Sequence, residues 1–337
     1  MGSLMGDLTF GHGMSPVSTG HLPVAERVGA LVQDAHQRFA ACNEGANADY
    51  IPVLAEVSPK LFGLCVAQTS GELHVAGDVD TCFSIQSISK PFVFGLVCQS
   101  LGEDKARELL GVNSTGLPFN SVMAVERSAQ GQSNPMVNAG AIATSSLAPG
   151  ESAAAKWQFI LQGLSRFAGR ELCMDEAVYQ SEMQTNQRNE GIAALLKSQA
   201  RIYFDPAEST DIYTRQCAVS VTVRDLAVMS ATLANGGVNP LTREAVIDPP
   251  HCQHVLAVMV TAGLYENSGD WLYDTGLPGK SGVSGGLIAV APGKGGFASF
   301  SPPLDEAGNS VRGQKSAMFL ADALGLNLFA SRPHHLG

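Results

Sequence analysis

The cysteines lack every spacing that is typical of a metal site or a disulfide framework. The chain has seven, an odd number, and none forms a C-x-x-C pair: Cys42, Cys65, Cys82, Cys98, Cys173, Cys217 and Cys252. Because disulfides persist in oxidising compartments, we expect reduced thiols and a cytoplasmic location. His251 and His254 have no third ligand nearby. We therefore expect a surface pair on a helix, and neither a metal nor any other cofactor.

Long apolar runs and basic clusters are also missing. The longest apolar stretches, such as residues 92–98, fall far short of the roughly 20 residues that span a bilayer. The formal charge is −10, with 21 Lys and Arg against 31 Asp and Glu, and such a chain repels nucleic acid and anionic membranes. We therefore expect a small-molecule substrate, with no nucleic-acid partner and no membrane partner.

The N-terminal segment lacks the basic residues of a signal peptide, because the first Lys or Arg is Arg27. Residues 1–22 are rich in Gly and Ser, and we expect a flexible leader there. The chain is 45% hydrophobic and 15% charged, which is typical of a folded globular protein. We expect one folded domain over residues 23–330 and a short tail over residues 331–337.

Both ends of this domain have patterns that predict a sheet with flanking helices. Apolar residues recur every three to four positions over residues 24–42, which predicts an amphipathic helix. We expect a β-hairpin over residues 61–68 and 72–76, and further strands over 287–291 and 297–300, because these apolar runs flank Gly-containing turns. Further helices are expected over residues 84–101 and 311–324.

The middle of the chain is mostly helical in pattern. Helices are expected over residues 152–168, 190–199, 223–234 and 251–262. Thr222 and Asp225 form a candidate capping box, and residues 235–237 (N-G-G) are a stop signal. We therefore expect an α/β (α+β) fold. In it, residues 23–101 and 280–330 build one antiparallel sheet flanked by helices, and residues 102–279 form an inserted all-helical subdomain.

An S-x-x-K motif, Ser87-Ile88-Ser89-Lys90, lies near the start of the helix expected over residues 84–101. Residues three apart share one face of a helix, so Lys90 can reach the Ser87 hydroxyl. A desolvated lysine can activate a serine nucleophile, and the apolar neighbours of Lys90 favour its desolvation. The motif also arises by chance about once in a chain of this length. An ordinary helix start with a solvated lysine therefore remains open.

A second motif, Lys280-Ser281-Gly282, precedes an expected strand. In S-x-x-K enzymes a K-T-G motif lies on the strand that borders the active site, and here Ser replaces Thr. Small residues let backbone N–H groups approach an oxyanion, although Gly-rich turns before strands are common. The order of the two motifs fits the expected sheet-helix-sheet layout. Together they predict the fold of penicillin-binding proteins and β-lactamases, and they leave the substrate open.

Longer stretches resemble the bacterial glutaminase family over about residues 24–329. They are 48–52 (A-D-Y-I-P), 83–90 (F-S-I-Q-S-I-S-K), 134–142 (N-P-M-V-N-A-G-A-I), 181–182 (S-E) with 188–189 (R-N), 213–217 (Y-T-R-Q-C), 263–265 (G-L-Y), 280–283 (K-S-G-V), 301–304 (S-P-P-L) and 308–310 (G-N-S). Two stretches depart from the family: N-S-T-G at 113–116 replaces E-P-S-G, and Gly279 stands where Ala commonly precedes the lysine. Neither departure changes a candidate catalytic atom.

The resemblance implies a serine-dependent glutaminase of β-lactamase/transpeptidase-like fold that binds L-glutamine. Ser87 would be the nucleophile, Lys90 its base, and Tyr213 and Tyr265 partners in proton transfer. The backbone N–H groups of Ser87 and Val283 would form the oxyanion hole. Further polar side chains would bind the ammonium, carboxylate and amide of the substrate: Tyr50, Gln86, Asn138, Glu182 and Asn189. A buried carboxylate suits an ammonium group, and neutral donors suit a carboxylate.

Each of these residues also has an ordinary structural interpretation. Tyrosines are commonly core or interface aromatics, asparagines cap helices or form turns, and glutamates are commonly solvated. With the resemblance, we expect hydrolysis of L-glutamine to L-glutamate and ammonia by a homodimer or homotetramer. The alternatives are a β-lactamase or other penicillin-recognising serine hydrolase, and a noncatalytic amino-acid binder.

Overall fold

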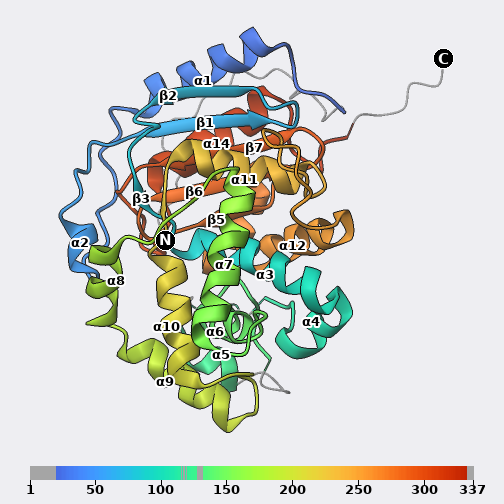
Figure 1. The fold of residues 1–337 in the computed structure, drawn as a ribbon. Helices are drawn as coiled ribbons and strands as arrows, with labels where there is room; N and C mark the ends of the chain where they lie inside the picture. The colour runs from blue at the N-terminus through green and yellow to red at the C-terminus, as the bar shows by residue number, and fades with distance from the viewer. Residues whose placement is uncertain (1–19, 115, 117, 119, 127–131, 332–337) are drawn as a thin grey trace.

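The computed structural model describes residues 20–114, 116, 118, 120–126 and 132–331 (Figure 1). Residues 1–19 of the expected leader and residues 332–337 of the expected tail lie outside this part of the chain. So does Thr115, in one of the two stretches that depart from the family. Within the described residues, no helix combines the length and the apolar character needed to cross a membrane.

A five-stranded antiparallel sheet has the strand order β2-β1-β7-β6-β5. The strands are β1 (Gly63–Gln68), β2 (Leu73–Gly77), β5 (Gly279–Ser281), β6 (Gly286–Ala291) and β7 (Gly295–Phe300). β1 from the N-terminal part of the chain pairs with β7 from the C-terminal part, and Val66 lies opposite Phe297. The predicted antiparallel sheet, with strands from both ends of the chain, is confirmed.

Helices cover both faces of this sheet, because strand residues alternate between the two faces. Leu64 and Val66 are buried in a cluster with residues of α1 (Ala25–Phe39) and α14 (Val311–Ala323). Cys65 and Ala67 are buried in the opposite cluster, with residues of α11 (Val223–Ala234). Figure 1 shows α1 along the β2 side of the sheet. Each face therefore contributes to its own hydrophobic core.

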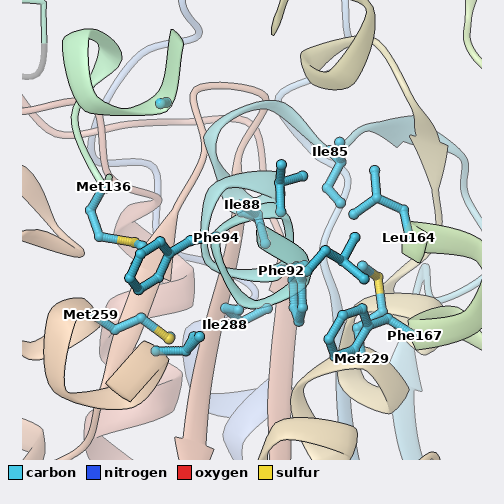
Figure 2. Close-up of a cluster of buried hydrophobic side chains, with 14 of the residues drawn as sticks. Ile85, Ile88, Phe92, Phe94, Met136, Leu164, Phe167, Met229, Met259 and Ile288 are labelled. Atoms are coloured by element: carbon cyan, nitrogen blue, oxygen red, sulfur yellow. The ribbon is translucent and has the colours of Figure 1, made fainter. Parts of the chain in front are cut away.

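The remaining helices include those of a predominantly helical half. They are α2 (Pro52–Ala55), α3 (Ser89–Leu101), α4 (Glu103–Leu110), α5 (Met123–Glu126), α6 (Asn138–Ser146), α7 (Ala153–Ala168), α8 (Glu176–Met183), α9 (Gln187–Ser198), α10 (Pro206–Cys217), α12 (Pro249–Ala262) and α13 (Ser268–Thr275). Figure 1 shows α4, α6, α9 and α10 gathered at the end of the molecule remote from β2. Phe92 and Phe94 of α3 are buried among side chains that include Ile288 of β6, as Figure 2 shows. α3 therefore connects the helical half to the sheet.

Most predicted elements are confirmed, but the helix expected over residues 84–101 is wrong at its start. β3 (Phe83–Ser84) pairs there with β4 (Ser220–Val221), and a 3-10 turn, η1 (Gln86–Ile88), precedes α3. Gln86 has a φ of 50°, in the left-handed region, and an α-helix cannot continue through that conformation. The capping box of Thr222 and Asp225 is confirmed at the start of α11.

Candidate active site

The S-x-x-K motif spans η1 and the first turn of α3, at the junction between the sheet and the helical half. Ser87 is 6% exposed and Lys90 is 1% exposed. Burial lowers the pKa of the Lys90 amine to about 7, against a smaller opposing effect of Cys217. A lysine with such a pKa is substantially neutral near neutral pH, and it can then accept a proton.

The backbone immediately before Ser87 is held in an unfavourable conformation. Gln86 is one of four non-glycine residues with positive φ in the described chain, and such a conformation costs about 1–3 kcal/mol. Its amide Nε2 donates to Glu182 Oε1 (2.5 Å) and to Ser84 Oγ (3.1 Å). Its carbonyl oxygen accepts a hydrogen bond from Ser89 Oγ (2.7 Å). These contacts fix the backbone N–H of Ser87.

Lys280 and Ser281 of the K-S-G motif lie on β5, the edge strand next to η1. The motif was expected before a strand, and this short strand was not predicted from the sequence. Gly282 follows the strand, and a Cβ at this position would lie 3.1 Å from the carbonyl oxygen of Ile85. The absence of a side chain therefore lets the end of β5 approach the turn that carries Ser87. Val283, the next residue, faces the same cavity as Ser87.

Tyr265, in the 3-10 turn η2 (Tyr265–Asn267), lies between the two motifs. Its hydroxyl donates to Ser281 O (3.4 Å), and its side chain is also hydrogen-bonded to Ser87. Lys280 Nζ lies 4.2 Å from the centroid of the Tyr265 ring. Burial raises the pKa of Tyr265 to about 12, so the phenol keeps its proton at neutral pH. Burial, and secondly the charge of Lys90, hold the pKa of Lys280 well below its usual value.

A wall of polar side chains from α6, α9 and α10 lies beside Lys90. Lys90 Nζ donates to Asn138 Oδ1 (2.8 Å), and the Tyr213 hydroxyl donates to the same oxygen (3.1 Å). Asn138 Nδ2 in turn donates to Asn189 Oδ1 (3.0 Å). Burial raises the pKa of Tyr213 well above its usual value, so this phenol also stays protonated.

These groups surround a cavity of about 280 Å³. Eight of the predicted site residues line it: Tyr50, Gln86, Ser87, Asn138, Glu182, Asn189, Tyr213 and Val283. The other two, Lys90 and Tyr265, do not line it and are buried beside residues that do. The structure therefore brings all ten predicted residues together at one site.

Six further residues line the cavity that the sequence had not assigned to it: Ile51, Asn120, Thr185, Asn186, Arg188 and Cys217. Ile51, Arg188 and Cys217 lie within stretches that carry the family resemblance, so their motifs held a signal. Arg188 Nε donates to Asn120 O (2.7 Å). Asn186 immediately precedes α9, a position that suggests a helix cap rather than a ligand.

Two charged residues, Glu182 and Arg188, line the cavity. Part of the Glu182 side chain faces the open cavity, yet burial by the surrounding protein raises the pKa of its carboxyl to about 7. The hydrogen bond from Gln86 acts in the opposite direction, since it favours the ionised form. A ligand that carries an ammonium group would restore the charge of this carboxylate.

The histidine pair expected on a helix surface needs one correction. Both residues lie on α12, but His251 is buried, and its Nδ1 lies 3.2 Å from Glu103 Oε2. Among the described residues, no group of three or more His, Cys, Asp or Glu side chains is arranged to hold a metal ion. All seven cysteines are unpaired, and Cys65, Cys98, Cys217 and Cys252 are buried.

Comparison with known proteins identifies the family and the fold. Residues 45–329 match the model of the family described as Glutaminase. The chain belongs to the glutaminase family. Glutaminase 2 of Yersinia pestis is 58% identical over 318 residues, which cover 94% of this chain and 94% of that protein. A glutaminase of Brucella canis is 48% identical over 308 residues, or 91% of this chain and 97% of that protein.

Solved glutaminase structures share the fold over nearly the whole described chain. The structure described as "Probable glutaminase ybaS" has a TM-score of 0.90 at 45% identity, covering 92% of this chain and 100% of that one. Mglu in its glutamate form has a TM-score of 0.86 at 37% identity, and the match covers 90% of this chain and 70% of that one. A third structure is described as a probable glutaminase from Bacillus subtilis complexed with 6-diazo-5-oxo-L-norleucine. Its TM-score is 0.80 at 32% identity, and the match covers 90% of this chain and 97% of that one. The predicted glutaminase and its β-lactamase-like fold are confirmed.

Proposed function

We propose that this glutaminase hydrolyses L-glutamine to L-glutamate and ammonia through an acyl-enzyme on Ser87, with Lys90 as general base. The observation that carries the proposal is the burial of Lys90 three residues after Ser87, which lowers the pKa of its amine to about 7. An amine that is neutral at the working pH can take the proton of a serine hydroxyl. An ordinary exposed lysine would stay protonated.

The reaction then proceeds in two displacements. Lys90 takes the Ser87 Oγ proton as the oxygen attacks the carboxamide carbon, and the N–H groups of Ser87 and Val283 stabilise the oxyanion. Collapse breaks the carbon–nitrogen bond, and the leaving group takes the proton of Lys90, directly or through a tyrosine hydroxyl that Lys90 reprotonates, and departs as ammonia. Water, deprotonated by the neutral amine, next cleaves the glutamyl ester. Glutamate and free Ser87 are regenerated.

The cavity also offers groups for the amino-acid end of the substrate. Glu182 would pair with the ammonium group, while Asn138, Asn189 and Tyr50 would donate to the carboxylate. Gln86, held by Glu182 (2.5 Å), would lie beside the amide. Two similar proteins support a ligand of this kind, since one is described in a glutamate form and the other in complex with 6-diazo-5-oxo-L-norleucine.

The test is ammonia release from L-glutamine by the wild type and by Ser87→Ala. We expect Ser87→Ala to lose activity while it keeps affinity for L-glutamate, and wild-type turnover in this variant would disprove the nucleophile. Hydrolysis of nitrocefin in place of glutamine would instead favour a penicillin-recognising enzyme. Glutamine binding without ammonia release would indicate a noncatalytic binder. The homodimer or homotetramer and the cytoplasmic location stay predictions.

A further inference from the structure

A chain of hydrogen bonds with one direction runs from Lys90 through three asparagine amides into α10. Its first link is the bond that Lys90 Nζ donates to Asn138 Oδ1 (2.8 Å). Asn138 Nδ2 donates to Asn189 Oδ1 (3.0 Å), and Asn189 Nδ2 donates to Asn186 Oδ1 (2.8 Å). Asn186 Nδ2 then donates to Thr214 Oγ1 (2.9 Å). Every amide therefore has its oxygen toward Lys90 and its nitrogen toward Thr214.

The two ends of the chain impose the same direction. Lys90 must keep its lone pair for the Ser87 proton, so it can meet Asn138 only as a donor. At the other end, the single hydroxyl hydrogen of Thr214 is used in a bond to Thr210 O (2.9 Å). Thr214 can therefore only accept from Asn186. With both ends fixed, none of the three amides can reverse without leaving two donors or two acceptors in contact.

This direction decides what the cavity wall presents to a ligand. Asn138 Oδ1 already accepts from both Lys90 and Tyr213, so its amide has only a second N–H left for a ligand. The amide of Asn189 likewise retains a second N–H. A carboxylate accepts hydrogen bonds and donates none, and it suits such a wall. A reversed Asn189 amide would turn its oxygen toward that carboxylate.

We propose that Asn186 and Thr214 are positioning residues that fix the Asn189 amide and so determine the affinity for the substrate carboxylate. The inference rests on the proposed function, from which it takes the carboxylate. Thr214 is 1% exposed and Asn186 is 4% exposed. Met183 Sδ lies 3.7 Å from Asn186 Nδ2 and accepts its other N–H. Thr214 belongs to the 213–217 stretch, in which only Tyr213 had been assigned a role.

The two ends of the chain should respond differently to its interruption. If the Thr214 contact is lost, Asn186 and then Asn189 lose their fixed orientation. Asn138 stays held by Lys90 and Tyr213, which both donate to its oxygen. Substrate binding should therefore weaken while the chemical step continues. A KM effect without a kcat effect distinguishes this role from a general loss of folded structure.

Thr214→Val removes the hydroxyl and keeps the shape of the side chain. We expect KM for L-glutamine to rise about tenfold, with kcat within about twofold of wild type, because one partner of a buried hydrogen bond is lost. The dissociation constant of L-glutamate, measured by calorimetry, should rise by the same factor. Thr214→Ser retains the hydroxyl and should restore both constants.

Thr210→Val is the matched control. Thr210 lies one turn earlier on α10, is equally buried and donates to the carbonyl oxygen four residues back, Pro206 O (2.8 Å). No described residue donates to its hydroxyl oxygen, so the variant should lose similar stability and keep wild-type KM. An unchanged KM in folded Thr214→Val, or an equal rise in Thr210→Val, would overturn the inference. A wild type that binds glutamate but releases no ammonia would refute the proposed function alone.

Discussion

The indole ring of Trp271 lies directly against Gly279, so that a Cβ at Gly279 would come within 2.7 Å of three of its ring atoms. The ring is fixed there, because Trp271 Nε1 donates to Leu277 O (2.7 Å) and the side chain is buried. This contact gives a physical reason for one departure from the family pattern. Alanine, common before the lysine of the K-S-G motif, does not fit beside this tryptophan.

Gly279→Ala should therefore destabilise the protein, by about 1–3 kcal/mol for overpacking of a buried site. Trp271→Leu should cost stability by itself, since it leaves space in the core. Combined with Gly279→Ala, it should cost less than the sum of the two single changes, because the alanine methyl then has room. Urea unfolding of the four proteins tests this, and strictly additive costs would contradict it.

Lys90 should determine the acidic limb of activity. The base must be neutral, and burial lowers the pKa of its amine to about 7. As pH falls through about 7, protonation removes the base, so kcat should fall, whereas above that pH it should level off. Lys90→Arg, which stays protonated, should lose about 10²–10⁴-fold in kcat at every pH. Rates of ammonia release between pH 5 and pH 9 measure this, and a kcat independent of pH would refute it.

Glu182 should contribute a second ionisation to kcat/KM. Burial raises the pKa of its carboxyl to about 7, and only the ionised form attracts an ammonium group. In the free wild-type enzyme, the logarithm of kcat/KM plotted against pH should have a slope of up to two below about pH 7. Glu182→Gln should raise KM and reduce that slope to one, since only Lys90 then titrates. Equal slopes in the two proteins would remove Glu182 from substrate binding.

Burial of Lys90 should cost stability in a defined pH range. The pKa of a lysine amine in an unfolded chain is 10.5, and in the folded protein burial lowers that of Lys90 to about 7. Above pH 10.5 the Lys90 amine is neutral in both the folded and the unfolded chain. Between pH 10.5 and about pH 7 the amine is protonated in the unfolded chain only, so the free energy of unfolding decreases as the pH falls through this range. Lys90→Met should therefore raise the free energy of unfolding more at pH 6 than at pH 10, by an amount on the order of 4 kcal/mol.

Lys156 provides the contrasting lysine for that experiment. It is also buried, but its Nζ donates to the carbonyl oxygens of Ser146 (3.1 Å) and Ala148 (2.6 Å). Lys156→Met should destabilise the protein, because two carbonyl oxygens lose their donor. A loss of stability at pH 6 in Lys90→Met as well would show that burial of the Lys90 amine carries no such penalty.

The parts of the fold that the sequence predicted are those with strong local signals. The β6–β7 hairpin and α11 have apolar runs between turn residues or a capping box, and both formed close to the expected bounds. α6 was not expected as a helix, because all nine of its residues are buried and no polar face produces a 3.6-residue period. The β3–β4 pair is too short for any pattern, and distant contacts determine it.

The site residues also divide into those that carry a sequence signal and those that do not. Ser87 and Lys90 were found because they lie in one short motif, and the other predicted residues came from the family resemblance. Asn186 was not predicted as a site residue, because an asparagine before a helix is usually explained as a cap and because its partner Thr214 is distant in sequence. The positive φ values of Gln86 and Tyr265 could not be predicted, since tertiary contacts impose them on residues that disfavour them.

The pairing of β1 with β7 bears on how the enzyme is made. During synthesis β1 leaves the ribosome long before β7 is translated. The edge of β1 that pairs with β7 therefore stays unpaired while the helical half is translated. β5 and Val283, which lines the same cavity as Ser87, are likewise translated late. A nascent chain therefore holds Ser87 before Val283 exists, so under the proposed mechanism its oxyanion hole is incomplete until translation is nearly finished. Such distant pairing also favours slow folding and a need for chaperones.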